Sequence, residues 1–97
     1  MMHPLINKES THYNNRDNPT IKKMEDIYTV EDMISFCKVN IFKYEDREKG
    51  QNESDKKKIK TYEDYLDLLY KLSYETGRRH ILVCDAYNYL GVKIEYK

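Results

Sequence analysis

The stretch DKKKIKTYEDYLDLLYKLSYET, residues 55–76, decides the fold of this chain. Apolar side chains recur in it every three or four residues, which is the spacing of one face of an α-helix. Gly77 follows directly and is a natural C-terminal stop, because glycine readily adopts the left-handed conformation. We therefore expect a helix over residues 55–76, with a buried stripe formed by Ile59, Tyr62, Leu66, Leu69 and Ser73 and widened by Tyr65 and Leu72.

A second helix is predicted upstream, over residues 30–46. Thr29 stands three residues before Asp32, an arrangement that resembles a capping box. The apolar positions that follow keep helical spacing: Val30, Met33, Ile34, Cys37, Ile41 and Tyr44. Residues 47–54, REKGQNES, contain glycine and asparagine but no apolar residue, so we expect them to connect two antiparallel helices.

The two ends of the chain differ from this helical hairpin. Residues 1–18 are polar and rich in asparagine, so we expect an N-terminal arm before a single domain at 19–97. Residues 19–28 permit a short helical turn. Residues 81–84 are apolar, and residues 92–97 alternate apolar with charged side chains, as strands do. A small C-terminal β-hairpin is the first interpretation and a helix over residues 84–90 is the alternative. The predicted fold class is therefore α+β, mainly α.

Composition excludes several classes of function. The 97 residues carry 17 Lys and Arg against 17 Asp and Glu, so the broad positive field that favours nucleic-acid binding is missing. Cys37 and Cys84 have no CxxC spacing and the histidines form no HxxxH pair, so we expect no metal and no cofactor. No stretch approaches the roughly 20 apolar residues that cross a bilayer, and we expect a cytoplasmic protein without a membrane partner. So small a core also favours a homo-oligomer.

Two polar rows flank the predicted connection between the helices. Phe36, Asn40, Lys43 and Arg47 follow one another at helical spacing, and Asp55, Lys58 and Tyr62 do the same on the second helix. If the hairpin closes, the rows converge, and their cations suit a phosphorylated ligand with a sugar or base near the carboxylate and tyrosine. Spacing alone favours the alternative of solvated side chains, with Asp55 as a helix cap and Lys58 paired to a neighbouring carboxylate.

The same residues resemble a known family. His12-Tyr13, Asn40-x-x-Lys43-Tyr44-x-x-Arg47, Lys49, Asp55-x-x-Lys58 and Tyr62 are similar to the pattern of the SaV-like bacteriophage proteins, domain of unknown function 3310. The resemblance covers about residues 12–70 and departs at Ile59, where the family has a small residue. It implies a phage accessory protein acting in the host cytoplasm, with Asn40, Lys43, Arg47 and Lys58 on phosphate and His12, Tyr13, Tyr44, Asp55 and Tyr62 in support.

Three functions follow from this interpretation. The first is binding of a nucleotide or nucleotide-derived ligand, which would sequester a host defence signal. The second is a nucleoside monophosphate kinase, because some relatives of the family carry a nucleotide kinase label. A chain with no glycine-rich phosphate loop makes an enzyme the weaker expectation. The third is an inhibitor that binds a host protein through its charged surface.

Overall fold

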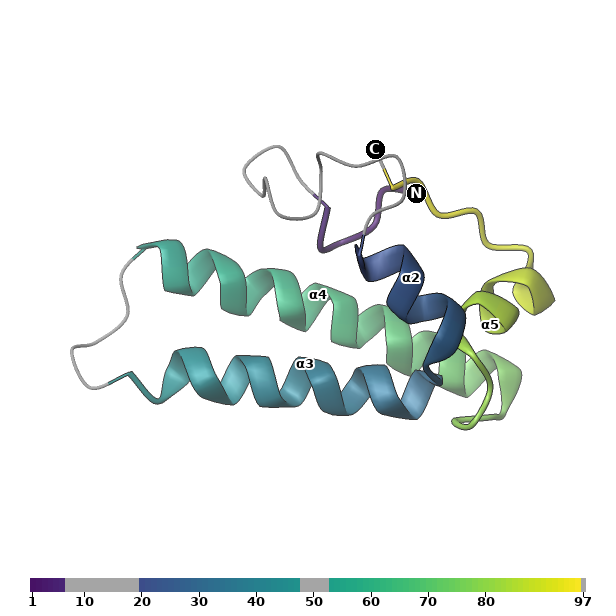
Figure 1. The fold of residues 1–97 in the computed structure, drawn as a ribbon, viewed down its shortest axis with the longest axis horizontal. Coiled ribbons are helices and arrows are strands. Elements are labelled where there is room, and N and C mark those ends of the chain that lie inside the picture. Colours follow the sequence, from purple (N-terminus) through teal and green to yellow (C-terminus); the bar gives the residue numbers. More distant parts are fainter. Residues whose placement is uncertain (7–19, 48–52, 97) are drawn as a thin grey trace.

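The computed structural model describes residues 1–6, 20–47 and 53–96. Its helices are α2 (Thr20–Ile27), α3 (Val30–Glu45), α4 (Glu53–Thr76) and α5 (Val83–Leu90). α3 and α4 run antiparallel along the long axis of the molecule, while α2 and α5 pack at one end of the pair (Figure 1). The predicted helical hairpin is confirmed. Separately, no helix in the described ranges is long and apolar enough to cross a membrane.

Local signals define both helices of the hairpin. Thr29 accepts a hydrogen bond from the backbone N–H of Asp32, and the Asp32 carboxylate accepts one from the Thr29 N–H, each at 3.1 Å. This capping box satisfies donors that the first turn of α3 leaves free. At the far end of α4, Gly77 has a φ of +67°, so the predicted stop rests on a conformation that other residues rarely adopt.

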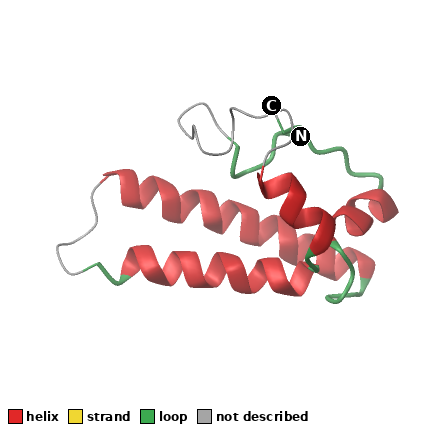
Figure 2. Cartoon of the chain, viewed as in Figure 1, coloured by secondary structure: helices red, strands yellow, loops and turns green. Residues whose placement is uncertain are grey.

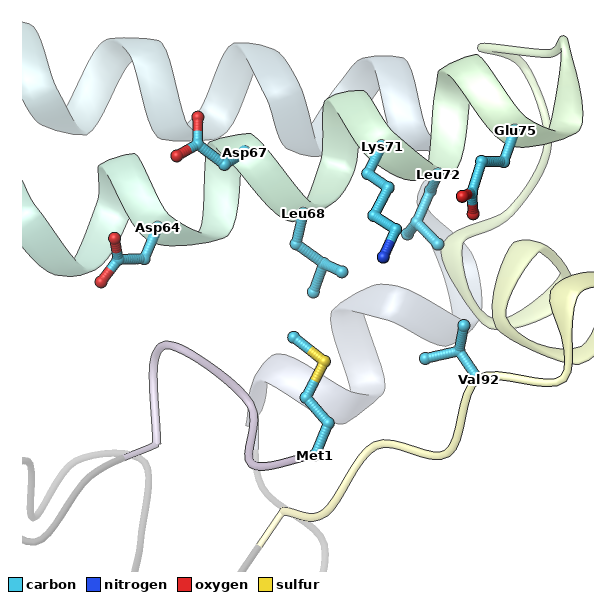
Figure 3. Close-up of a pocket in the computed structure, with 8 residues that line it drawn as sticks. All are labelled: Met1, Asp64, Asp67, Leu68, Lys71, Leu72, Glu75 and Val92. Carbon is cyan, nitrogen blue, oxygen red and sulfur yellow. The ribbon is translucent and has the colours of Figure 1, made fainter.

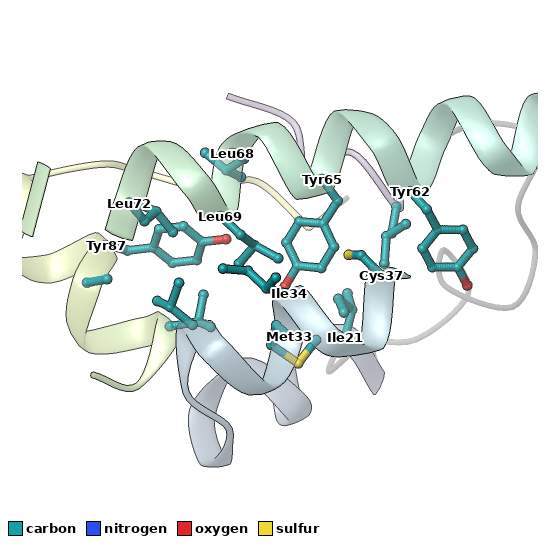
Figure 4. Close-up of a cluster of buried hydrophobic side chains, with 14 of the residues drawn as sticks. Ile21, Met33, Ile34, Cys37, Tyr62, Tyr65, Leu68, Leu69, Leu72 and Tyr87 are labelled. Carbon is teal, nitrogen blue, oxygen red and sulfur yellow. The ribbon is translucent and has the colours of Figure 1, made fainter. Parts of the chain in front are cut away.

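The core lies between α3 and α4 and extends under α5 (Figure 4). Tyr65 and Leu69 on α4 are fully buried, and Leu72 is 1% exposed. Leu66, expected in the middle of the apolar stripe, is only partly buried, whereas Leu68 belongs to the core. The buried face of α4 is therefore rotated toward Tyr65 and Leu68, because α5 as well as α3 covers this helix.

The predicted C-terminal β-hairpin is wrong, and so is the α+β class that depended on it. Residues 83–90 form α5 instead, close to the alternative helix over residues 84–90, and Figure 2 shows helices and loops throughout the described chain. Val83, Ala86 and Tyr87 are buried at helical spacing, and Gly91 ends the helix with a φ of +69°. Burial of this apolar face outweighs the turn tendency of the asparagine and glycine nearby.

The alternating residues 92–96 are extended but do not form a sheet. Their recorded pairing is an isolated parallel bridge between Met2 and Glu95. The Glu95 N–H donates to the Met1 carbonyl at 2.7 Å, and the His3 N–H donates to the Glu95 carbonyl at 3.0 Å. The alternation therefore signals an extended segment whose neighbour is the N-terminus rather than a second strand from residues 81–84.

The first six residues pack into the core, although they lie in the segment expected to be a polar arm. His3 is fully buried, and Leu5 and Ile6 are 2% and 3% exposed. His3 Nε2 lies 3.0 Å from a carboxylate oxygen of Glu25 on α2, which is also fully buried. Because His3 Nδ1 accepts the Leu5 N–H at 3.1 Å, Nε2 is the nitrogen that donates to Glu25.

Tyrosines complete the shell around Glu25. The hydroxyls of Tyr65 and Tyr87 donate to Oε2 at 2.6 and 2.7 Å, and that of Tyr96 donates to Oε1 at 2.5 Å. Burial raises the pKa of Glu25, but the hydrogen bonds from His3, Tyr65 and Tyr96 outweigh it and leave the pKa below its ordinary value. One carboxylate thus joins the N-terminal segment, α2, α4, α5 and the C-terminal segment.

Candidate functional site

The end of the helical hairpin where the chain passes from α3 to α4 gathers cations around one aromatic ring. The ring belongs to Tyr44, near the C-terminus of α3. The guanidinium carbon of Arg47 lies 5.2 Å from its centroid, and the ammonium nitrogens of Lys58 and Lys43 lie 5.3 and 5.6 Å from it. We call these four residues the Tyr44 cluster. Cation–π attraction explains how a ring holds such charges, but it contributes only about 0.5–1 kcal/mol for each exposed pair.

A buried carboxylate fixes the arginine of the cluster. Arg47 Nε lies 3.6 Å from Asp55 Oδ2; the Arg47 side chain is 47% exposed and that of Asp55 only 4%. Asp55 belongs to the first turn of α4, so this ion pair ties the end of α3 to the start of α4. Asp55 is within the helix, which begins at Glu53, rather than at the cap position considered from the sequence.

Aromatic packing supports the ring from the core side. The Tyr44 and Tyr62 rings are stacked with centroids 6.2 Å apart, and Phe36 meets Tyr62 edge-on at 5.8 Å. Tyr62 is 7% exposed, so it belongs mainly to the core. The structure therefore places Tyr62 in the core, with its ring packed against the ring of Tyr44.

The other predicted site residues are placed less directly. The Asn40 side-chain amide donates to the Phe36 carbonyl one turn earlier, at 2.8 Å, which leaves its carbonyl oxygen as the group that can face a ligand. His12, Tyr13 and Lys49 lie outside the described residues. The convergence expected from the two polar rows thus concerns Lys43, Arg47, Asp55 and Lys58.

The charges of the cluster define what it can do chemically. Lys43, Arg47 and Lys58 bring three positive charges to one ring, and the Asp55 carboxylate pairs with Arg47. All three cations lie within 5.6 Å of the same centroid, so like charges gather around one ring. An arginine beside lysines is a donor set suited to phosphate.

A pocket along the C-terminal half of α4 is separate from the Tyr44 cluster. It is a groove of about 280 Å³, lined by α4 and by Met1 and Val92 (Figure 3). Leu68 and Leu72 form its floor, and Asp64, Asp67, Lys71 and Glu75 complete its lining. None of the sequence-predicted site residues lines this groove. Within the described ranges, no group of three or more His, Cys, Asp or Glu side chains could hold a metal ion.

Sequence reasoning missed the shell around Glu25. A buried glutamate is hard to recognise because acidic residues are almost never fully buried unless they are paired. Glu25 stands four residues after the buried Ile21, so helical spacing places both on one face of α2. That spacing was the available signal, whereas the donors come from residues far apart in sequence.

Comparison with known proteins identifies one family. The model of the DUF3310 family, described as a protein of unknown function, matches residues 7–64. This range is more than half of the chain and contains the whole Tyr44 cluster together with Asp55. No curated protein and no solved structure matches the chain.

Proposed function

We propose that this chain, which belongs to the DUF3310 family of proteins of unknown function, binds a nucleotide or nucleotide-derived phosphorylated ligand at the Tyr44 cluster. The observation that carries the proposal is the position of the Lys43, Arg47 and Lys58 charges, all within 5.6 Å of one tyrosine ring. Because Coulomb attraction grows with the charge of the ligand, a dianionic or more highly charged group gains more beside these three cations than a single charge would.

Each residue has a distinct part in this proposal. Asp55 contacts the Nε side of the Arg47 guanidinium, so the terminal amino groups are the donors that grip a phosphate. Lys43 on α3 and Lys58 on α4 each act as a point charge. Tyr44 offers an aromatic edge or face to a base, and the Asn40 carbonyl accepts from a sugar hydroxyl or base amine.

The biological setting is also proposed. The resemblance of Asn40-x-x-Lys43-Tyr44-x-x-Arg47 to the SaV-like phage proteins supports a phage accessory protein acting in the host cytoplasm, where capture of a nucleotide signal would blunt a host defence. Binding without turnover is the form of the proposal we favour, because the cations of the Tyr44 cluster suit a phosphate and the sequence has no glycine-rich phosphate loop.

Calorimetric titration with ATP, ADP, AMP and inorganic pyrophosphate tests the proposal. We expect wild-type protein to bind at least one of these probes and Arg47→Ala to bind it markedly less. Arg79→Ala is the matched control, because Arg79 also lies over a tyrosine ring, at 5.8 Å from Tyr70, and pairs with a carboxylate, Glu31, at 3.1 Å. Arg79 is outside the cluster, so its loss should leave binding unchanged.

Native mass spectrometry of protein purified from phage-infected cells adds the natural ligand to this test. A retained phosphorylated compound that is absent from Arg47→Ala protein supports the proposal and gives the ligand a mass. New nucleotide products after addition of ATP and a nucleoside monophosphate would instead indicate a kinase. If none of the probes binds and no compound is retained, the nucleotide proposal is wrong and a host protein becomes the partner to seek.

A further inference from the structure

The outer face of α3 carries an apolar patch that points away from the core. Val39 is 66% exposed and Phe42 is 67% exposed. With Ser35 and Asp46, both also exposed, they are spaced by four, three and four residues, which aligns them in one stripe on the side opposite the buried Cys37. This is the spacing of a short helix-to-helix seam, with apolar residues in the middle and polar residues at both ends.

We propose that a second copy of this chain packs antiparallel against this stripe, about a twofold axis midway between Val39 and Phe42. In that register Val39 of one copy meets the partner's Phe42, and Ser35 meets the partner's Asp46. The serine hydroxyl donates to the aspartate carboxylate, so the polar ends of the seam complement each other. A twofold axis repeats every contact, as in other closed dimers.

Charge complementarity favours a second copy over an unrelated partner. Lys38 and Glu45 lie on the same flank of the stripe, seven residues apart. The antiparallel register brings Lys38 within two residues' rise, about 3 Å along the helix axis, of the partner's Glu45, and symmetry gives a second such pair. Lys38 is exposed and its ammonium lies 5.9 Å from the Tyr70 centroid, a weak contact that does not prevent this pairing.

The opposite flank of the stripe carries Lys43. The twofold axis keeps each flank on the same side of the helix pair, so the Tyr44 clusters of the two copies lie on one common side of the dimer. This inference concerns assembly and does not depend on ligand binding, because the seam is formed by residues outside the cluster.

Sedimentation velocity of the full chain tests the dimer. We expect wild-type protein to show a mass near twice the 11.8 kDa of one chain, in equilibrium with monomer. Phe42→Ser should raise the dimer dissociation constant by about tenfold or more, since buried aromatic residues dominate such interfaces. Tyr74→Ser is the control, because Tyr74 is 89% exposed on α4, away from the seam. A wild-type monomer at all concentrations, or a dimer that Phe42→Ser leaves intact, would overturn the proposal.

A charge-reversal experiment tests the register. Lys38→Glu and Glu45→Lys should each weaken self-association, because each puts like charges opposite one another across the seam. An equimolar mixture of these two variants should form heterodimers more readily than either forms homodimers, since both pairs become complementary. Circular dichroism confirms that each variant is folded. Equal association of the mixture and the separate variants would exclude this antiparallel register.

Discussion

The Tyr65 hydroxyl donates a 2.6 Å hydrogen bond to the buried carboxylate of Glu25, forty positions earlier in the chain. This bond joins the middle of α4 to α2, and the hydroxyls of Tyr87 and Tyr96 reach the same carboxylate. An ionised group in an apolar core is costly unless donors compensate it, so the shell around Glu25 is where several segments of the fold depend on one another.

Glu25→Gln should destabilise the protein strongly. An amide accepts fewer and weaker hydrogen bonds than a carboxylate, and each hydrogen bond to a charged group contributes roughly 1.5–3 kcal/mol. With several donors affected, we expect a loss of about 3 kcal/mol or more in the free energy of unfolding, measured by urea titration. Asp26→Asn is the control, because its exposed ion pair with Lys22 at 3.5 Å should contribute little. Equal effects of the two variants would contradict the role given to Glu25.

Alkaline pH should destabilise the fold through the same tyrosines. Burial, with the charge of Glu25 next, raises the pKa of Tyr65, Tyr87 and Tyr96 above the ordinary value of 10.0. Their contribution is fully present below pH 10 and is lost as the pH rises further, because the unfolded chain then releases protons that the folded chain keeps. The slope is about 1.4 kcal/mol per pH unit for each such tyrosine.

Urea titrations at a series of pH values around 10 measure this slope. Tyr87→Phe should make the slope shallower by one tyrosine, whereas Tyr89→Phe should not, because Tyr89 is 72% exposed. Stability that does not change above pH 10 would show that these hydroxyls are not held by Glu25.

The two cysteines should react very differently with a thiol reagent. Burial, followed by the charge of Glu25, raises the pKa of Cys37 to about 12. Burial and then the charge of Asp85 raise the pKa of Cys84 as well, but its side chain is only partly buried. At about pH 8, titration with an aromatic disulfide should detect one thiol in the folded chain and both in denaturant. Rapid reaction of Cys37 in folded protein would be inconsistent with the buried α3 face.

Replacing α4 leucines with alanine should distinguish fully buried positions from partly buried ones by the loss of stability. Leu69 is fully buried and Leu66 only partly, so Leu69→Ala should cost roughly 2–5 kcal/mol of stability and Leu66→Ala clearly less. The sequence pattern had placed Leu66 at the centre of the stripe. Chemical denaturation of both variants decides between the two assignments, and a larger loss for Leu66→Ala would favour the original one.

Removal of the Arg47 guanidinium should weaken ligand affinity without unfolding the protein. We expect Arg47→Ala to cost about 1.5–3 kcal/mol of binding free energy for the best phosphorylated probe, the scale of a charge-assisted hydrogen bond. Its ion pair with Asp55 is half-exposed on the arginine side, so the thermal midpoint should change far less than affinity. Unchanged affinity in a folded variant would remove Arg47 from the site.

Local rules determined the helical hairpin from sequence alone. The capping pair Thr29 and Asp32, the apolar spacing of α3 and α4, and Gly77 act over a few residues, so each could be recognised without knowing the rest of the fold. The same period placed Lys43 with Arg47 on one face of α3. Their approach to Lys58 then followed from closure of an antiparallel pair.

Tertiary structure decided what short windows leave ambiguous. Residues 83–90 satisfy the patterns of both a turn and a helix, and burial of Val83, Ala86 and Tyr87 selected the helix. Residues 92–96 are extended, yet they pair with the N-terminus through Met2 and Glu95. Glu25 could enter the core only because side chains from distant segments supply its hydrogen bonds. Sequence spacing reports which residues share a local face, but the free energy of burying a charge depends on partners that only the folded chain brings together.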